Sequence, residues 1–553
     1  MTDIGRREFL ARTVVPSSVL AIGAVPASAL ARSLTRGRSL LADSHVDVLI
    51  GEPIATIAPE IYGHFVEHLG GVVYDGIWVG EQSKIPNVGG IRKALIDALR
   101  PLRPAVVRWP GGCFADAYDW RDGVGPREKR PRRTNVWADD ERLRALGNIP
   151  ARFEPNSFGT NEFMRFVRAV GAQPYFGANL RTQPASVFHQ WVEYCNSPVG
   201  STTLAELRAQ GGDPEPFGVR YWGVGNESWG CGGNFTPDEY AAEYRRFSTW
   251  AVQEHGVPLH FIGAGPSGGD YEWTRRFFDQ VNRRGDLGRM WGWALHHYCS
   301  APNGEAVAFD NTAWYELLAS ADKMESLITG HWQVMREADR DHHVKLVVDE
   351  WGAWHKQTTN VDPSHLFGQQ STMRDALVAG LTLDTFNRHA DKVAMANVAQ
   401  LVNTIQSLFL AHDEQFLVTP TYHVFAMYTP HQGGQSLRTL ISAPRLAYTD
   451  SEKKERTLWG MAGSASRKDG VVTLTLTNPH LTQPRDTEIV LRGGSVRSIS
   501  AMTLSHTDVH AHNTFDAPRT VTPETTAVPT VGNAIVHRLP PASVTRLQFV
   551  LGA

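Results

Sequence analysis

The chain carries the stretch Tyr221-Trp-Gly-Val-Gly-Asn-Glu-Ser-Trp-Gly230, in which a short apolar run ends at Asn226 and Glu227. A second such run, Leu346-Val-Val-Asp-Glu-Trp-Gly352, ends at Glu350. A β-branched, apolar run that stops at a polar residue is typical of a buried parallel strand, at the end where the chain turns away. One glutamate at such a place can be an ordinary solvated residue. Two at matching strand ends predict a catalytic pair, with an acid for a glycosidic oxygen and a nucleophile or base for the anomeric carbon.

Short apolar runs recur along the chain and alternate with segments of helical period. The eight candidate strands are 61–65, 105–109, 174–179, 220–225, 259–264, 292–297, 345–350 and 393–398. One intervening segment, Thr236-Pro-Asp-Glu239, has the N-cap, the proline and the acids that open a helix. Strand–helix alternation repeated eight times predicts a (β/α)₈ TIM barrel, whose sites lie at the C-terminal ends of its strands. Glu227 then follows the fourth strand, and Glu350 ends the seventh.

The pattern of apolar and polar residues changes after about residue 430. Val472, Leu474 and Leu476 alternate with threonines, and Gly, Pro and Ser fill the gaps between such segments. This period-two pattern predicts a C-terminal antiparallel β-sandwich domain, jelly-roll-like in character. Residues 45–58 alternate in the same way and are expected to add a strand to that sandwich. The predicted organisation is a signal peptide at 1–31, a linker at 32–44, the added strand at 45–58, the barrel at 59–430 and the sandwich at 431–553.

The composition is that of a soluble, multidomain protein. The 553 residues are too many for one core, and 42% hydrophobic with 20% charged residues is ordinary. A net charge of −3 argues against nucleic acid or an anionic membrane as the main partner. Sixteen Trp suit a sugar-binding protein, although core packing must account for most of them.

The N-terminal segment has the features of an export signal. Arg6 and Arg7 precede an uncharged apolar stretch at 13–31, and small residues near Ala29 and Ala31 suit cleavage. Two prolines and several small residues make this stretch a poor membrane span. The pattern predicts twin-arginine export to the periplasm or the medium.

The cysteines and histidines predict no metal and no cofactor. Four cysteines are too few for a disulfide scaffold, and the sequence leaves open whether any two are bridged. Cys113 and Cys231 both lie beside strand-end motifs, so either could be a free thiol near the site. No Cys/His spacing matches a zinc site, and Asp341-His-His343 is interpreted as an exposed turn.

Several separated motifs resemble those of one family. They are Ile61-Tyr-Gly-His-Phe-Val-Glu-His-Leu-Gly70, Arg108-Trp-Pro-Gly-Gly-Cys-Phe114 continuing to Pro126, Glu154-Pro-Asn-Ser-Phe-Gly-Thr160, Trp222 to Asn234, Leu295-His-His-Tyr298, Val348-Asp-Glu-Trp-Gly352, Asn397-Val-Ala-Gln-Leu-Val-Asn403 and Thr419-Pro-Thr-Tyr-His-Val-Phe425. Together they resemble glycoside hydrolase family 51, the α-L-arabinofuranosidases of a retaining clan with the acid on strand four and the nucleophile on strand seven. The likeness runs from about residue 61 to 428, and the sandwich matches only in character.

The resemblance implies roles for individual residues. Glu227 would be the acid/base, Glu350 the nucleophile, and Asn226 would hydrogen-bond the sugar 2-hydroxyl. The residues implied to hold the furanose, orient the nucleophile or line the subsite are Glu67, Cys113, Tyr298 and Gln400. The implied reaction removes terminal α-L-arabinofuranosyl residues from arabinose-containing oligo- or polysaccharides by double displacement, and the implied assembly is a hexamer.

Three other functions are weighed against this one. Gly263-Ala-Gly-Pro-Ser-Gly268 matches the G-x-G-x-x-G pattern of dinucleotide-binding enzymes, but it lies in the fifth strand unit and a lone match has low specificity. A non-catalytic carbohydrate-binding protein would be expected to lack one of the glutamates, and both are present. A two-glutamate barrel acting on a β-1,4-glucan or a xylan remains the main alternative.

Overall fold

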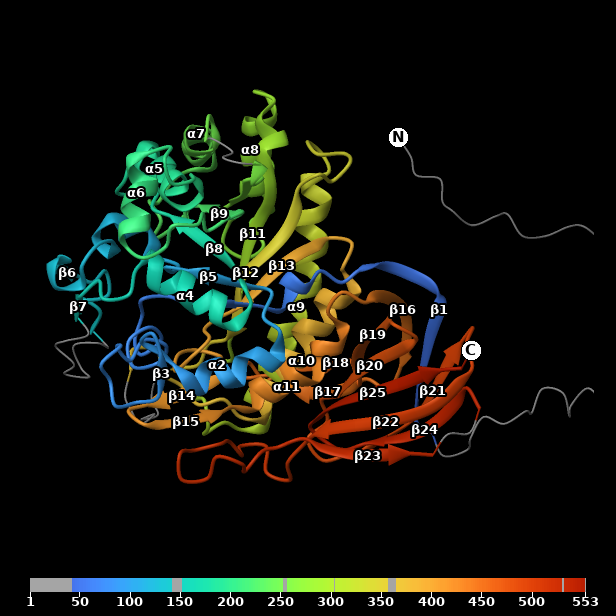
Figure 1. Cartoon of the computed structure of the whole chain (residues 1–553). Coiled ribbons are helices and arrows are strands. Elements are labelled where there is room, and N and C mark those ends of the chain that lie inside the picture. Colours follow the sequence, from blue (N-terminus) through green and yellow to red (C-terminus); the bar gives the residue numbers. More distant parts are fainter. Residues whose placement is uncertain are drawn as a thin grey trace, which may run out of the picture. The chain divides into compact units, whose positions relative to one another are not determined.

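The computed structural model describes residues 42–141, 152–251, 256–302, 304–356, 365–529 and 532–552. Residues 43–553 form one compact unit, in which a barrel and a β-sheet domain lie side by side (Figure 1). The predicted signal peptide at 1–31 lies outside the described residues, as does most of the predicted linker.

Eight parallel strands close into a barrel, in the order β10-β11-β12-β13-β2-β5-β8-β9. Their bounds are β2 (Gly63–Phe65), β5 (Val106–Trp109), β8 (Gln173–Ala178), β9 (Tyr221–Val224), β10 (His260–Gly263), β11 (Met290–Cys299), β12 (Lys345–Ala353) and β13 (Val393–Val398). Each strand overlaps one of the eight predicted runs, so the predicted barrel is confirmed. The seventh strand, β12, is longer than predicted and continues three residues beyond Glu350.

Helices surround the barrel and connect its strands (Figure 1). Their bounds are α2 (Lys93–Leu99), α4 (Thr160–Val170), α5 (Ala185–Asn196), α6 (Thr203–Gln210), α7 (Pro237–Ser248), α8 (Tyr271–Asn282), α9 (Asn311–Met335), α10 (Met373–Arg388) and α11 (Pro420–Tyr428). Helix α7 begins as its sequence predicts, because Thr236 caps it and Glu239 bonds back to the Thr236 N–H.

The barrel interior is a packed core rather than a pore. One buried side chain from each of seven strands meets the others there: Val106, Tyr175, Tyr221, Ile262, Ala294, Val347 and Met395. Such a layer of inward-pointing residues is the usual filling of a (β/α)₈ barrel. It closes the middle of the barrel and leaves the C-terminal strand ends free to carry a site.

The second domain is a nine-stranded sheet in the order β23-β22-β25-β20-β19-β16-β1-β21-β24. The bounds are β1 (Ser44–Thr56), β16 (Gln435–Ser442), β19 (Ala462–Lys468), β20 (Val471–Asn478), β21 (Arg485–Arg492), β22 (Val496–Leu504), β23 (Glu524–Val528), β24 (Ala534–Leu539) and β25 (Ser543–Leu551). Apolar side chains from most of these strands share one core, as in a sandwich. β1 lies inside the sheet, antiparallel to β16 and parallel to β21, so the sheet is not wholly antiparallel.

Four two-stranded ribbons complete the described strands. They are β3 (Asn87–Val88) with β4 (Ile91–Arg92), β6 (Arg133–Thr134) with β7 (Phe153–Glu154), β14 (Phe409–His412) with β15 (Gln415–Val418), and β17 (Leu446–Thr449) with β18 (Glu455–Leu458).

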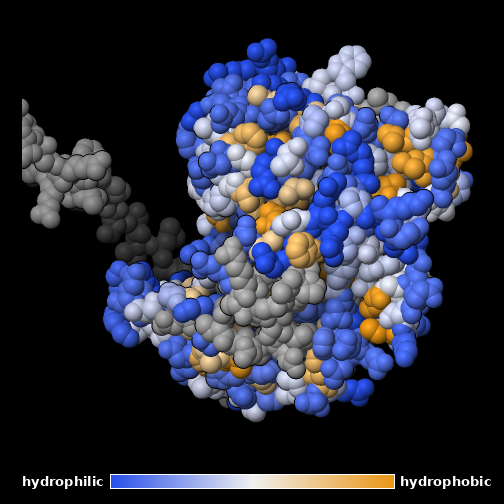
Figure 2. Space-filling model, turned by 90° about the vertical axis from the view of Figure 1, so that its left-hand side faces the viewer, coloured by the Kyte–Doolittle hydropathy of each residue, from blue (hydrophilic) through white to orange (hydrophobic). Residues whose placement is uncertain are grey.

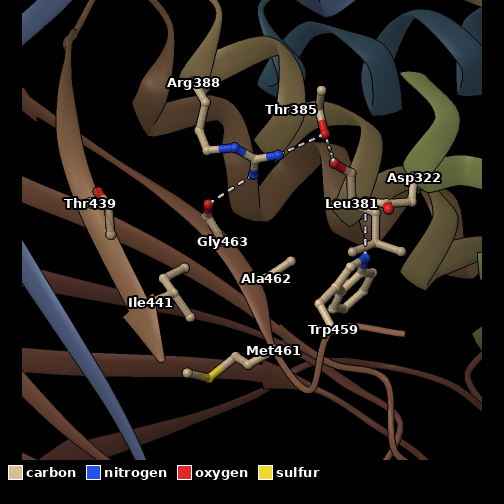
Figure 3. A pocket seen from close by; sticks show the side chains of 10 residues that line it. All are labelled: Asp322, Leu381, Thr385, Arg388, Thr439, Ile441, Trp459, Met461, Ala462 and Gly463. Atoms are coloured by element: carbon tan, nitrogen blue, oxygen red, sulfur yellow. Dashed lines mark hydrogen bonds between the residues drawn. The ribbon is translucent and has the colours of Figure 1, made fainter. Parts of the chain in front are cut away.

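Helix α10 joins the barrel to the sheet. The threonines of β20, which alternation alone would place in solvent, are buried because α10 packs over that face. Thr475 donates a 2.6 Å hydrogen bond to Asp384 of α10. At the edge of this contact Arg388 donates to the Gly463 carbonyl oxygen over 3.0 Å, beside a pocket that residues of both domains line (Figure 3).

The Gly-rich segment 263–268 is a tight barrel loop. Its backbone runs so close to β11 that a Cβ on Gly265 would lie 1.8 Å from the Ala294 carbonyl oxygen. The glycine is therefore needed for packing between neighbouring strand units, which accounts for the pattern without a nucleotide.

On the face shown in Figure 2, hydrophobic residues form separate groups among hydrophilic ones. None of the helices in the described part of the chain has both the length and the apolar character to cross a bilayer.

Candidate active site

The two glutamates that the sequence pairs lie together at the C-terminal end of the barrel. Glu227 follows β9 by three residues and has a positive φ of 36°, while Glu350 lies in β12. A carboxylate oxygen of each and a ring nitrogen of His296 lie within 4.8 Å of one another. Residues 123 positions apart in the chain therefore form one cluster.

Glu350 is held by two donors. Arg108 Nη1 donates to Glu350 Oε1 over 2.7 Å, and Tyr298 OH donates to Oε2 over 2.8 Å. Burial raises the pKa of Tyr298 well above its usual value, and the charge of Glu350 raises it further. Tyr298 therefore stays a neutral hydrogen-bond donor to the Glu350 carboxylate.

Asn226 is fixed at both its side chain and its backbone. Its Oδ1 accepts from Arg108 Nη2 over 2.6 Å, and its backbone N–H donates to Asp116 Oδ2 over 3.0 Å. Burial raises the pKa of Asp116 to about 7, although three backbone N–H groups oppose that shift. One guanidinium thus joins Asn226 to Glu350.

Glu67 and Gln400 form a reciprocal pair beside this cluster. Gln400 Nε2 donates to Glu67 Oε2 over 3.1 Å, and the Glu67 N–H donates to Gln400 Oε1 over 2.9 Å. The Phe114 N–H donates to the second Glu67 oxygen. Burial, and then the charge of Glu350, raise the pKa of Glu67 to about 7.

Cys113 and Cys231 form a disulfide, so neither is the free thiol that the sequence allowed. Cys231 Sγ lies 3.6 Å from Glu227 Oε2, which places the bridge against that glutamate. The bridge ties the loop after β5 to the loop after β9. Sequence alone could not pair the two cysteines, because they are 118 residues apart and only the fold brings them together.

Three further residues of the cluster were not predicted as site residues. Arg108 and His296 stand within motifs that the sequence analysis quotes, and Asp349 precedes Glu350 directly. His296 Nδ1 lies 3.0 Å from Glu227 Oε1, and its Nε2 lies 3.0 Å from Asp349 Oδ1. A buried arginine at the end of a barrel strand was the available signal for Arg108, since such a charge requires a partner.

One group outside the cluster has the donor atoms for a cation. Asp75, His412 and Asp413 bring ligand atoms within 4.8 Å of one another at a partly exposed position. Arg92 already forms an ion pair with Asp75, which counts against a second cation there. We assign no metal to these residues.

Curated relatives cover most of the chain. An intracellular exo-α-L-arabinofuranosidase of Bacteroides ovatus is 37% identical over 89% of this chain and 91% of its own length. An intracellular exo-α-(1→5)-L-arabinofuranosidase of Streptomyces lividans is 29% identical over 85% of this chain and 70% of its own.

The prediction of export is contradicted by these relatives, because both are named intracellular enzymes. Twin arginines before an apolar stretch are a short pattern, and chance can produce it. The location predicted from that pattern is therefore wrong on this comparison.

Family models and a solved structure agree with the relatives. The model described as Alpha-L-arabinofuranosidase 1 domain matches residues 98–283, and the model described as Alpha-L-arabinofuranosidase C-terminal domain matches residues 349–543. The crystal structure of the GH51 arabinofuranosidase from Xanthomonas axonopodis pv. citri has 35% identity and a TM-score of 0.85, over 92% of this chain and all of that one. The barrel, its glutamate pair and these likenesses agree, and the chain belongs to glycoside hydrolase family 51, the α-L-arabinofuranosidases.

Proposed function

We propose that the enzyme removes terminal α-L-arabinofuranosyl residues from arabinose-containing oligo- or polysaccharides with retention of configuration. The observation that carries this proposal is the closeness of Glu227 and Glu350, whose nearest oxygens lie no more than 4.8 Å apart. In retaining enzymes the carboxyl groups are about 5–5.5 Å apart, and in inverting ones about 6.5–9.5 Å, because a water must fit between them. The short separation favours direct attack of one carboxylate on the anomeric carbon over attack by a water molecule held between the two carboxylates.

Glu350 is the nucleophile in this proposal. Its carboxylate accepts hydrogen bonds from Arg108 and Tyr298, which fix its position, and its side chain is only 7% exposed. Glu227 is more open, with 20% of its side chain exposed, as a group that meets a leaving oxygen must be. Glu350 attacks the anomeric carbon while Glu227 gives its proton to the departing oxygen.

The second step reverses the roles of proton donor and acceptor. Water attacks the anomeric carbon of the glycosyl-enzyme, its proton passes to Glu227, and the ester bond to Glu350 breaks. Both residues then return to their starting states, so the product keeps the configuration of the substrate.

Asn226, Glu67 and Gln400 are proposed to hold the sugar. Arg108 occupies the Oδ1 of Asn226, and of the two Nδ2 hydrogens one points towards Cys231 Sγ over 3.8 Å, which leaves the other for a sugar hydroxyl. Glu67 and Gln400 hold each other in place beside the nucleophile, so that a furanose hydroxyl would meet fixed partners.

The substrate class comes from the relatives. Both relatives described above are named exo-enzymes, and the name of the Streptomyces lividans enzyme specifies the α-(1→5) linkage. Removal of single terminal residues is therefore proposed for this chain as well. The family resemblance further supports assembly into hexamers, which sedimentation of the purified protein would test.

Azide rescue of two alanine variants tests the mechanism. Glu350→Ala should lose turnover of every substrate, and azide should restore slow reaction with inverted configuration because it attacks from the vacated face. Glu227→Ala should still form the glycosyl-enzyme from a dinitrophenyl arabinofuranoside, and azide should then release a product of retained configuration. The same product stereochemistry from both variants, read by NMR, would refute the assignment of roles.

A substrate panel tests the sugar. Aryl α-L-arabinofuranosides should be cleaved far faster than aryl xylosides or glucosides. The opposite order would favour the alternative of an enzyme acting on a glucan or xylan.

A further inference from the structure

His296 lies between three carboxylates. Its Nδ1 is 3.0 Å from Glu227 Oε1 and 3.4 Å from Glu350 Oε2, and its Nε2 is 3.0 Å from Asp349 Oδ1. The imidazole therefore links the proposed acid/base to the buried carboxylate of Asp349.

Asp349 reaches His296 because β12 is irregular at this point. Neighbouring residues of a regular strand point to opposite faces, so Asp349 and Glu350 should point apart. The pairing of β12 with β13 shifts register between Val348 and Trp351, and that with β11 shifts beside His296. The local distortion brings two consecutive carboxylates to one imidazole.

The surroundings keep Asp349 charged. Tyr175 OH donates to its Oδ2 over 3.1 Å, and Arg108 Nε lies 3.6 Å from the same oxygen. Burial alone would raise the pKa of Asp349, but Arg108 and His296 outweigh it and lower the pKa below its usual value.

We infer that Asp349 is a positioning residue that acts through His296 to hold the proton used by Glu227. The 3.0 Å approach of Nε2 to the ionised Asp349 favours a hydrogen on Nε2, and Nδ1 then shares the remaining proton with Glu227 Oε1. The negative charge of Asp349 stabilises that proton on whichever of the two atoms carries it. This inference rests on the proposed function, in which Glu227 is the acid/base.

The charges around His296 agree in direction. Burial would lower the pKa of His296, but Glu350, Asp349 and Glu227 together hold it well above its usual value. The titratable and charged groups that face it are Glu227 from the loop after β9, and Asp349 and Glu350 from β12, with Arg108 of β5 and Tyr175 of β8 behind Asp349.

The first test is Asp349→Asn, with the pH dependence of kcat/KM for 4-nitrophenyl α-L-arabinofuranoside as readout. Removing the negative charge should release the shared proton at lower pH, and the basic limb should move down by about one pH unit or more. Asp341→Asn makes the same change at an 84% exposed side chain and should leave the limb in place. An unmoved or raised limb in Asp349→Asn would overturn the inference.

Tyr175→Phe gives a test of opposite sign, which also serves if Asp349→Asn does not fold. Without the tyrosine hydroxyl the Asp349 carboxylate becomes a stronger base, so it holds the His296 proton more tightly and the basic limb should rise. A general loss of order in the site gives no reason for the basic limb of the pH profile to shift in opposite directions in the two variants. A limb that falls in Tyr175→Phe, or does not move, would contradict the inference.

Two further variants locate a failure. In a His296→Gln background, Asp349→Asn should no longer move the basic limb of the pH profile, because His296 no longer connects Asp349 to Glu227. A shift that persists in this background would refute the action of Asp349 through His296. Glu227→Gln should abolish the basic limb if Glu227 is the acid. A limb that survives in Glu227→Gln would refute the proposed function, whereas a limb lost there but unmoved in Asp349→Asn would refute only the role of Asp349.

Discussion

Arg108 donates to Glu350 across 2.7 Å, and its other terminal nitrogen donates to Asn226 across 2.6 Å. Its side chain is almost completely buried. A planar guanidinium can serve two acceptors at fixed positions, which a lysine ammonium on a flexible stem cannot. The distance between the proposed nucleophile and the proposed sugar ligand is therefore set by one side chain.

Arg108→Lys should lower kcat/KM for an aryl arabinofuranoside by about 10²-fold or more, an effect comparable to loss of one preorganised donor. The positive charge remains, so the loss would report geometry rather than charge. Arg121→Lys, at an exposed arginine paired with Asp119, is the matched control and should keep full activity. Near-normal kcat/KM in Arg108→Lys would show that charge alone suffices.

Gly112→Ala should reduce activity while the protein stays folded. A Cβ at this position would lie 2.8 Å from Glu350 Oε1 and 3.4 Å from Asn226 Nδ2, so it would displace the nucleophile. The backbone of Gly112 is not in the left-handed region, so alanine adds only bulk. Gly288→Ala, with no atom within 4 Å of its added Cβ, should be silent. Unchanged kcat and KM in Gly112→Ala would contradict the close approach.

Thiol counts should reveal the bridge between Cys113 and Cys231. The denatured chain should show two reactive thiols without a reductant, from the buried Cys195 and Cys299, and four with one. Replacing both bridged cysteines by Ser should lower the free energy of unfolding by about 2–5 kcal/mol. The unfolded chain then gains conformational entropy, because no cross-link closes the long loop between the two positions. Four thiols in the denatured, unreduced protein would disprove the bridge.

Asp384→Asn should change how stability depends on pH. Burial raises the pKa of Asp384 to about 7, although Ser464, Thr475 and Tyr428 donate to it. Because the folded-state pKa lies above the unfolded one, the contribution of Asp384 to the free energy of unfolding is fully present below about pH 4 and is lost as pH rises through about 7. The variant has no charge to bury, so its stability relative to the wild type should improve by roughly 2–4 kcal/mol between pH 4 and pH 8.

Chemical denaturation of both proteins at several pH values would measure this difference. Other buried acids, such as Asp116 and Glu67, remain in both proteins and cancel in the comparison. A constant offset across the pH range would mean that Asp384 does not titrate between the two states.

The barrel could be predicted from the sequence because its signals are local. Short apolar runs such as 174–179, which ends at Asn179, alternate with helical segments, and each predicted run overlaps a strand. Thr236 begins α7 through contacts that span only three residues. The glutamate pair could be found in the same way, since each residue lies within three residues of the C-terminal end of its own strand.

Features that depend on distant contacts could not be read from the sequence. The pattern of β20 predicts an exposed threonine face, but α10 covers it, and that contact is made only by the folded chain. Regular strand geometry predicts that Asp349 points away from Glu350, and a register shift reverses this. Local periodicity contains no information about either.

The position of β1 inside the sheet has a consequence for synthesis on the ribosome. Leu49 pairs with Arg438 of β16 on one side and with Arg492 of β21 on the other, so the first of the described strands waits for partners 389 and 443 residues downstream. At ~5–20 residues per second, the partner strands are synthesised roughly 20–90 s after Leu49. Until β16 has been synthesised, Val46, Val48 and Ile50, which lie in the core of the folded sheet, have no neighbouring strand to cover them. The barrel must therefore be able to fold while an unpaired apolar strand precedes it in the nascent chain. Until the strands of the sheet are synthesised, β1 has an unpaired edge that can associate with other chains.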